Sequence, residues 1–550
     1  MRSLLNCMMR QSDKIEKFKK FQHVEHALHA KYNSRTLDTV HGDQEWGHLQ
    51  LDATGLFLLM LAQMTASGLK IIYSRDEVEF VQNLVFYIES AYRTADYGIW
   101  ERGDKTNHGV AELNASSVGM CLAALEAIDG LDLFQCRGGY NSIIHVLSDE
   151  KARCQDILES LLPRESHSKE VGAALLPVIL YPAFAVPNLD IVNKTTEAVN
   201  SKLSGTYGYV RFLRDGYWTP IEDKNRLHYD PFELEQFDQI ECHWPLFLCF
   251  QLINKVFQQY AERGNDAQIT DEISKLEEQI GKVLIYGESE HRLPLLPMAY
   301  AVPAGKHLQE KQQPGSVERV PVGHLPHIWG QALYIVARLL AENLITPGEI
   351  DPLNRRLSTQ KRPEVVVQVA VLATTDFVKE KLRKFGFTVQ TPNELTQISV
   401  KPMSHLMELY SLLGRSKKLK LSGRPKNRIG VLGTSKLYEV QNQQLTIFYP
   451  EFTNTDDFWI VADIYMLIDR VKTELNYLQS HWTLPGRPTI VIPIGPELLR
   501  RRFYRCRNSV QVFRQSVTKL FEIWGHLEAW GYRSGMYNIF SKIIEKIILT

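Results

Sequence analysis

The chain has 550 residues, with 63 basic and 63 acidic side chains, and 44% of its residues are hydrophobic. Equal numbers of opposite charges argue against bulk electrostatic attraction to nucleic acid or to anionic lipid, so shape and specific contacts must provide binding. Because single hydrophobic cores stop growing at roughly 250–300 residues, the length predicts two or three domains.

Seven cysteines are scattered without a C-x-x-C pair, which is typical of reduced thiols inside the cell. Cys242 and His243 are neighbours, but adjacent helical residues point about 100° apart and no third ligand is near in sequence. We therefore expect no metal site and no cofactor. The chain lacks a secretory signal, and its apolar runs fall short of the ~20 residues that span a bilayer, so we expect a soluble, cytoplasmic protein.

From about residue 48 to 344, apolar side chains recur at three- and four-residue spacing between loops rich in Gly, Pro, Asp and Asn. This periodicity predicts helix after helix. The clearest predicted helices span residues 49–69, 76–92, 116–128, 232–260, 271–284 and 327–342. Sequential helix pairs are consistent with an α/α toroid, and periodicity alone is equally compatible with a solenoid of helical pairs.

After Pro347 the pattern changes, because the β-branched runs at 364–372 and 489–494 predict strands. We therefore expect a mixed α/β unit over residues 357–500. Within it, the basic stretch 415–426 is interpreted as a solvated surface loop rather than a phosphate site.

The C-terminal segment is basic, with ten Lys or Arg and three Glu from Arg500 to Thr550. Apolar side chains recur there at helical spacing. Such a helix either packs on its own domain or engages calmodulin or a membrane face, and the first is the ordinary reading of this spacing.

The stretch 97–105 reads Tyr-Gly-Ile-Trp-Glu-Arg-Gly-Asp-Lys and places the carboxylate of Glu101 beside the indole of Trp100. An aromatic face binds the apolar side of a pyranose, and a neighbouring carboxylic acid with a raised pKa can protonate a glycosidic oxygen. On its own, the stretch is also compatible with a helix–loop junction that has a core tryptophan and solvated charges.

Several further segments carry a family resemblance in one order along the chain: 47–53, 112–119, 161–166, 211–217, 240–247, 325–331, 421–425 and 431–436. Together with 97–105 they resemble the regulatory subunits of phosphorylase kinase, the alpha and beta family, over most of residues 1–500. Residues 348–356 look more like alpha and residues 160–166 more like beta, and we favour an alpha-like subunit.

The resemblance implies a mainly α fold. Residues 1–356 would form a domain similar to glucoamylases, a six-hairpin α/α toroid with a sugar pocket at one end. Residues 357–500 would form the smaller mixed α/β domain, and 501–550 the basic helical tail, which lies outside the resemblance. Residues 5–11 resemble an interior helix of the family, so we expect the toroid to be N-terminally truncated in this chain.

The comparison with glucoamylases also implies site residues. Glu101 falls at the general-acid position, whereas the general base is expected in a Leu-Pro-Glu motif, where this chain has Met298. An inverting glycosidase needs a second carboxylate roughly 6.5–9.5 Å from the acid. A thioether cannot accept a proton from water, and Glu288 or Glu290 would substitute only from a shifted loop. We therefore predict a vestigial centre with no catalytic residues.

Five residues are candidates for binding a sugar without cleaving it: Trp100, Arg102, Asp104, Glu241 and Trp244. The main functional expectation is a regulatory subunit that controls the catalytic gamma subunit of phosphorylase kinase and thereby glycogen breakdown. The implied partners are gamma, the other regulatory subunit and calmodulin. The alternatives are an α-glucan hydrolase and a non-catalytic glucan-binding sensor, and no nucleic-acid partner is expected.

Membrane attachment in this family is implied by prenylation of a C-a-a-X cysteine. This chain ends in Lys-Ile-Ile-Leu-Thr and its final cysteine is Cys506, so it offers no prenyl acceptor. We expect any contact with the cytoplasmic face of the cell membrane to come through the complex.

Overall fold

The computed structural model describes most of the chain: residues 1–43, 49–100, 105–262, 266–287, 292–359, 364–384, 386–440, 444–453 and 464–496. Contacts between Cα atoms divide the chain into two compact units. The first contains residues 1–146, 150–361 and 413–425, and the second contains 147–149, 362–412 and 426–550.

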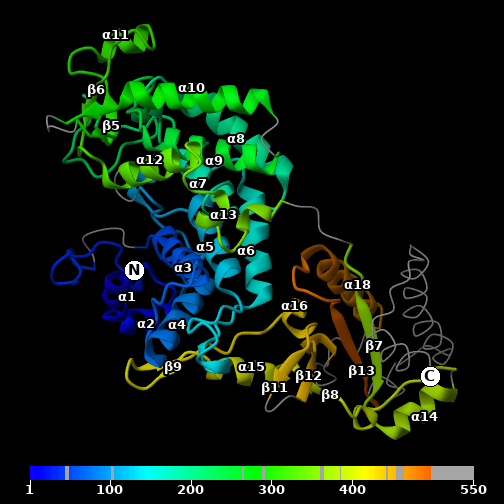
Figure 1. The fold of residues 1–550 in the computed structure, drawn as a ribbon. Coiled ribbons are helices and arrows are strands. Elements are labelled where there is room, and N and C mark those ends of the chain that lie inside the picture. Colours follow the sequence, from blue (N-terminus) through cyan, green and yellow to red (C-terminus); the bar gives the residue numbers. More distant parts are fainter. Residues whose placement is uncertain are drawn as a thin grey trace. The chain divides into compact units, whose positions relative to one another are not determined.

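The first unit is built mainly from helices, as Figure 1 shows from blue to green. Its longer helices are α1 (Arg2–Met9), α2 (Ser12–Phe21), α3 (Leu51–Ala66), α4 (Arg75–Ala91), α5 (Ala115–Ile128), α6 (Ser148–Leu161), α8 (Leu189–Leu203), α9 (Leu246–Ala261), α10 (Ala267–Val283) and α12 (Ile328–Ala341). Shorter ones are α7 (Leu176–Ile179), α11 (His307–Gln312) and α13 (Pro347–Ile350). The expected mainly α fold class is confirmed.

Helices α3 and α5 pack together at the centre of this unit. Nearly every residue of α5 is buried, which is the pattern of a helix surrounded by others rather than lying on a surface. Two other helices begin at clear capping signals. Ser74 and Glu77 form a reciprocal capping box at the start of α4, and Asp266 accepts backbone N–H groups at the start of α10.

One predicted helix is wrong in its first half. Residues 233–237 form a short 3-10 turn, and α9 begins only at Leu246. Before it, the backbone of Trp244 donates to the oxygen of Tyr209 at 2.7 Å and accepts from its nitrogen at 3.2 Å. Pro245 then starts the helix, since its missing N–H costs nothing at that position. The apolar spacing continues through this region, but the tertiary pairing sets the boundary.

Small strands support the loops of the first unit. They are β1 (Ser204–Gly205) with β2 (Gly208–Tyr209), β3 (Ile285–Tyr286) with β4 (Pro294–Leu295), and β5 (Ala299–Ala301) with β6 (Val320–Val322), each pair antiparallel.

The basic stretch belongs to the first unit and forms a hairpin of β9 (Arg415–Ser416) and β10 (Leu421–Ser422). Part of it is buried. Arg424 pairs with Glu89 of α4 at 3.1 Å, and both side chains are about 5% exposed or less. The ammonium of Lys19 in α2 donates to the backbone oxygen of Gly423 at 2.8 Å. The interpretation as a solvated loop is therefore wrong for this end of the hairpin, whereas Lys418 is exposed.

The second unit has parallel strand pairs. The two strands expected from β-branched runs are present as β7 (Gln368–Ala373) and β13 (Thr489–Ile494), which pair in parallel from Gln368 with Thr489 onward. A second sheet has the order β11 (Tyr438–Val440), β12 (Gln444–Tyr449) and β8 (Ile398–Pro402), with β12 parallel to β8. The helices of this unit are α14 (Asp376–Lys384), α15 (Met403–Leu412), α16 (Val431–Thr434) and α18 (Ile464–His481).

The predicted basic tail, residues 501–550, lies outside the described residues. Among the helices that the structure does describe, none combines the length and apolar character required to cross a membrane.

Candidate functional site

Aromatic side chains from distant parts of the first unit meet around Trp100. Its ring centre lies 5.7 Å from that of Trp244, and the ring of Phe247 in α9 approaches edge-on at 6.3 Å. Tyr217 stacks on Trp244, with 6.2 Å between the ring centres. The structure therefore brings together Trp100 and Trp244, two of the five predicted sugar-binding residues.

A buried arginine lies among these rings. The Arg211 guanidinium carbon is 4.7 Å from the Trp100 ring centre, 4.5 Å from Tyr217 and 5.2 Å from Trp244. A cation over aromatic faces is stabilised by the ring quadrupoles, and more strongly when water is excluded. Its charge is balanced by Asp215, because Nε and Nη2 donate to the two carboxylate oxygens at 2.5 and 2.8 Å.

Arg211 and Asp215 were not among the residues predicted to form the site. The signal that could have found them is the i,i+4 spacing of opposite charges within an aromatic stretch, since neither residue type is buried without a partner.

Trp244 has a buried polar atom that the described part of the chain leaves without an acceptor. The side chain is 5% exposed, and its indole Nε1–H has no hydrogen-bond partner there. Leaving such a donor unpaired costs about 1–3 kcal/mol, so an incoming hydroxyl group that accepts this hydrogen would be favoured. The arrangement combines an apolar face with one free donor, which suits a sugar.

Glu241 lies close in sequence to Trp244 and is 5% exposed. Its carboxylate accepts the backbone N–H of Arg214 at 2.7 Å. Burial, together with the nearby charges of Asp238 and Asp215, raises the pKa of this carboxyl to about 7. A carboxyl group with a pKa near neutrality can donate or accept a proton at physiological pH, so Glu241 retains acid–base capacity.

Met298 is held by packing. It is 7% exposed and belongs to the main hydrophobic core of the first unit. Its backbone N–H donates to the oxygen of His324 at 3.1 Å, just before β5 pairs with β6. A Cβ placed on Gly323 would come within 2.3 Å of the Met298 methyl carbon, so the side chain lies against the glycine backbone. Gly323 also has a φ of 80°, which favours glycine.

The remaining predicted site residues fall outside the described part of the chain. These are Glu101, Arg102 and Asp104, which follow Trp100 directly, and the substitute carboxylates Glu288 and Glu290.

A buried acid anchors the turn that carries Trp100. Asp96 accepts hydrogen bonds from the Ser117 hydroxyl at 2.7 Å and the Asn114 amide at 2.9 Å. Burial raises the pKa of Asp96 to about 6. Burial and the charge of Asp96 together raise the pKa of Asp52 to about 7, and one Asp52 oxygen has no partner among the described residues.

Asn114 also lies within 3.1 Å of where a Gly98 Cβ would be, so the network sets the course of residues 96–100. Asp96 and Asp52 were not predicted as site residues, because the packing of α3 on α5, and not local sequence, brings this network together.

Cys242 is fully buried and its neighbour His243 is partly buried. Burial raises the pKa of the Cys242 thiol to about 12 and lowers the pKa of His243 to about 3. Both groups are therefore neutral at physiological pH, and the thiol is poorly suited to act as a nucleophile.

Comparisons with known proteins identify relatives of this chain. The family model described as glycosyl hydrolases family 15 matches residues 1–548. The liver isoform of phosphorylase b kinase regulatory subunit alpha from Oryctolagus cuniculus is 55% identical over 91% of this chain and 39% of that protein. The skeletal muscle isoform from the same animal is 54% identical over the same shares. The probable alpha subunit of Drosophila melanogaster is 51% identical over 90% of this chain and 38% of its own length.

The chain therefore spans about two fifths of the length of the curated relatives it matches. The alpha-like character expected from residues 348–356 is confirmed, since these relatives are alpha subunits. Among solved structures, a glycosidase variant superposes with a TM-score of 0.40 and 14% identity, over 62% of this chain and 81% of that one.

Proposed function

The chain belongs to glycosyl hydrolases family 15, and we propose that, within this family, it acts as a regulatory subunit of phosphorylase b kinase rather than as a hydrolase. The observation that carries this proposal is the 55% identity over 91% of the chain to a regulatory subunit alpha. The chain spans about two fifths of the length of such a subunit, and we extend the proposal to the activity and partners of the whole subunit.

Loss of hydrolysis is supported by the side chain at the expected base position. Met298 offers a thioether, packed in the core, where the mechanism needs a carboxylate to activate water. Glu241 has a raised pKa, but its carboxylate is engaged by the Arg214 backbone. We propose that Glu101 is a vestigial acid without a partner base.

Regulation of a kinase requires that this chain contact its active and inactive states with different free energies, since equal affinity shifts nothing. We propose that the partners are the catalytic gamma subunit, the other regulatory subunit and calmodulin, in the cytoplasm, with any membrane contact made through the complex. We further propose that residues 1–356 are the glucoamylase-like domain, 357–500 the mixed α/β regulatory-subunit domain and 501–550 a basic helical tail.

Co-expression tests this function. The chain is produced with the catalytic subunit, the other regulatory subunit and calmodulin, and the complex is isolated through a tag on the catalytic subunit. We expect this chain to co-elute in a fixed ratio and to change the Ca²⁺ dependence of kinase activity. Co-elution equal to that of an unrelated protein, or an unchanged Ca²⁺ response, would refute the proposal.

Trp244 favours a second candidate, a non-catalytic glucan-binding sensor. Its buried Nε1–H lacks an acceptor in the described part of the chain, and Trp100 provides an aromatic face beside it. Calorimetry with maltose and acarbose tests this. We expect millimolar binding that weakens in Trp100→Ala and in Trp244→Phe, which keeps an aromatic ring but removes the donor.

No heat with either sugar would exclude the sensor and leave the regulatory proposal standing. Release of glucose from maltose, abolished by Glu101→Gln, would instead establish the hydrolase.

A further inference from the structure

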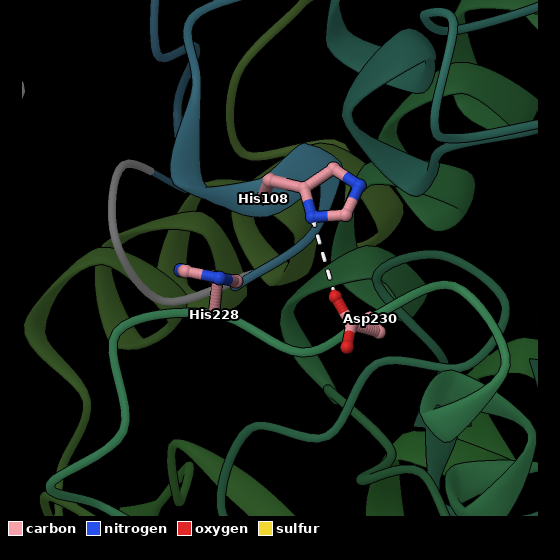
Figure 2. Close-up of side chains that lie close together, drawn as sticks. All are labelled: His108, His228 and Asp230. Carbon is pink, nitrogen blue, oxygen red and sulfur yellow. Dashed lines mark ion pairs between the residues drawn. The ribbon is translucent and has the colours of Figure 1, made fainter.

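A separate group of metal-ligating side chains lies on two loops of the first unit. Figure 2 shows His108, His228 and Asp230 close together, with His108 on one loop and the other two on a second. One ligand atom from each residue lies within 4.8 Å of the others. The Nδ1 atom of His108 is 3.4 Å from Oδ1 of Asp230, and the two imidazole ring centres are 5.8 Å apart.

We propose that His108, His228 and Asp230 form a binding site for a divalent cation of the zinc class, with solvent completing the coordination. Metal–ligand distances of about 2.0–2.1 Å in a tetrahedral site place neighbouring ligand atoms roughly 3.3–3.4 Å apart. The His108–Asp230 separation already matches this edge. The His228 ligand atom lies within 4.8 Å of the other two, so it has to come closer to them to complete the same geometry.

The donor set selects the class of ion. Two imidazole nitrogens and one carboxylate oxygen suit zinc and its neighbours in the first transition row, whereas Ca²⁺ and Mg²⁺ prefer oxygen ligands alone. The side chains of His108 and Asp230 are 53% and 45% exposed, so solvent can reach the site and supply the open position.

The two loops are fixed to each other by contacts that do not involve the ligands. The backbone oxygen of Lys105 accepts the N–H of Tyr229 at 3.1 Å. The Lys105 ammonium donates to the backbone oxygen of Asp223 at 2.7 Å. It also pairs with the buried carboxylate of Glu222 at 2.8 Å. The residues beside the ligands are therefore held in place before any ion binds, which lowers the entropic cost of binding.

The second loop is also braced from within. The backbone N–H of Asp230 donates to the carboxylate of Glu233 at 2.8 Å, which fixes the backbone at this ligand. The ring of Tyr229, between His228 and Asp230, is 4% exposed and packs edge-on against Phe237 at 5.0 Å. Anchoring the middle residue inward directs its two neighbours along the outer side of the loop.

The first loop adopts a backbone that is unusual for its residues. Asn107, His108 and Gly109 have successive φ angles of 49°, 54° and 71°. Left-handed conformations cost non-glycine residues free energy and tend to be retained at functional sites. Gly109 lies close to His228, since a Cβ placed on it would be 3.7 Å from the His228 Cβ. The strained turn thus brings the two histidines together.

This site is independent of the regulatory proposal and of Met298. His108 lies a few residues after Glu101 in the sequence. A bound ion would therefore link the loop that follows Glu101 to residues 222–230. Sequence spacing does not indicate the site, because its two halves are far apart in the chain.

Calorimetric titration of the untagged full chain with zinc chloride, in reducing buffer, tests the site. Cys136 is the exposed cysteine of the described residues, so all proteins carry Cys136→Ser to remove a competing ligand. We expect one zinc ion per chain at micromolar concentration. His108→Ala, His228→Ala and Asp230→Asn should each weaken binding at least about tenfold.

His405→Ala is the matched control, since His405 is also a half-exposed histidine beside a carboxylate, that of Glu408 at 3.8 Å. We expect it to bind zinc as the parent does. Circular dichroism checks that each variant is folded, and zinc should raise the unfolding temperature of the parent but not of the three ligand variants. Zinc binding that is absent, that survives all three substitutions, or that Mg²⁺ matches at equal concentration would overturn the proposal.

Discussion

Arg211 and Asp215 form a two-point ion pair, with Nε and Nη2 of the guanidinium 2.5 and 2.8 Å from the two carboxylate oxygens. Both side chains are almost completely buried, at 2% and 0% exposure. The guanidinium also lies against Trp100 and Trp244, so this pair links the charge balance of the core to the aromatic site.

Removal of the Arg211 side chain should strongly destabilise the first unit. Arg211→Ala leaves the Asp215 carboxylate buried without its cation, and breaking a buried pair in this way costs about 3–5 kcal/mol. Urea unfolding followed by tryptophan fluorescence measures the loss. Lys275→Ala, which breaks the exposed pair with Asp271, serves as control and should leave the midpoint unchanged. Equal midpoints for both variants would contradict this role.

Met298 should behave as a packing residue. Met298→Leu conserves volume and should cost less than about 1.5 kcal/mol, whereas Met298→Ala leaves a cavity and should cost about 2–5 kcal/mol. The same unfolding measurement applies. If the alanine variant were as stable as the leucine variant, the thioether would not be filling the space beside Gly323.

Glu241 should make stability depend on pH. Its folded-state pKa is raised to about 7 by burial, above the unfolded value near 4.5. The folded state therefore holds the proton more tightly, and stability falls as pH rises from about 4.5 to 7. Relative to Glu241→Gln, the parent chain should lose at most about 1.4 kcal/mol per pH unit in this window.

Unfolding measured at several pH values for both proteins gives this difference directly, and the other titrating acids cancel. A difference that stays constant between pH 4.5 and 7 would show that Glu241 titrates normally.

The hairpin at 413–425 should contribute to the stability of the first unit. Arg424→Ala removes the guanidinium that pairs with the buried carboxylate of Glu89 and should cost about 3–5 kcal/mol. Lys418 lies in the same hairpin, but its side chain is 78% exposed and its pair with Asp76 is 3.4 Å long. Lys418→Ala should cost less than about 1 kcal/mol, because solvent screens such pairs. Comparable losses for the two variants would indicate a solvated hairpin.

Local sequence patterns predicted several of the longer helices of the first unit. The apolar spacing of residues 49–69, 116–128 and 327–342 predicted α3, α5 and α12 to within a few residues, because burial of one helical face or of a whole helix leaves a periodic signal. The β-branched runs likewise predicted β7 and β13, although not that they pair in parallel.

Sequence motifs and the family resemblance, rather than spacing, placed two candidate residues in one site. Trp100 and Trp244 were both recognised from the sequence motifs around them, and in the structure their ring centres lie 5.7 Å apart. Other residues that support this region were not predicted. Arg211, Asp96 and Asp52 carry their significance through burial and through partners that are distant in the chain, which local spacing does not encode.

Only the tertiary structure decided where α9 begins, where the hairpin 413–425 belongs and which histidines meet. Residues 232–245 continue the apolar spacing of a helix, but residues 233–237 form a 3-10 turn and the Tyr209–Trp244 bridge holds the backbone just before α9. Likewise, His108 and His228 approach because Lys105 joins their loops. Short-range periodicity reports which face of an element is buried, whereas contacts between distant segments depend on how the whole unit packs.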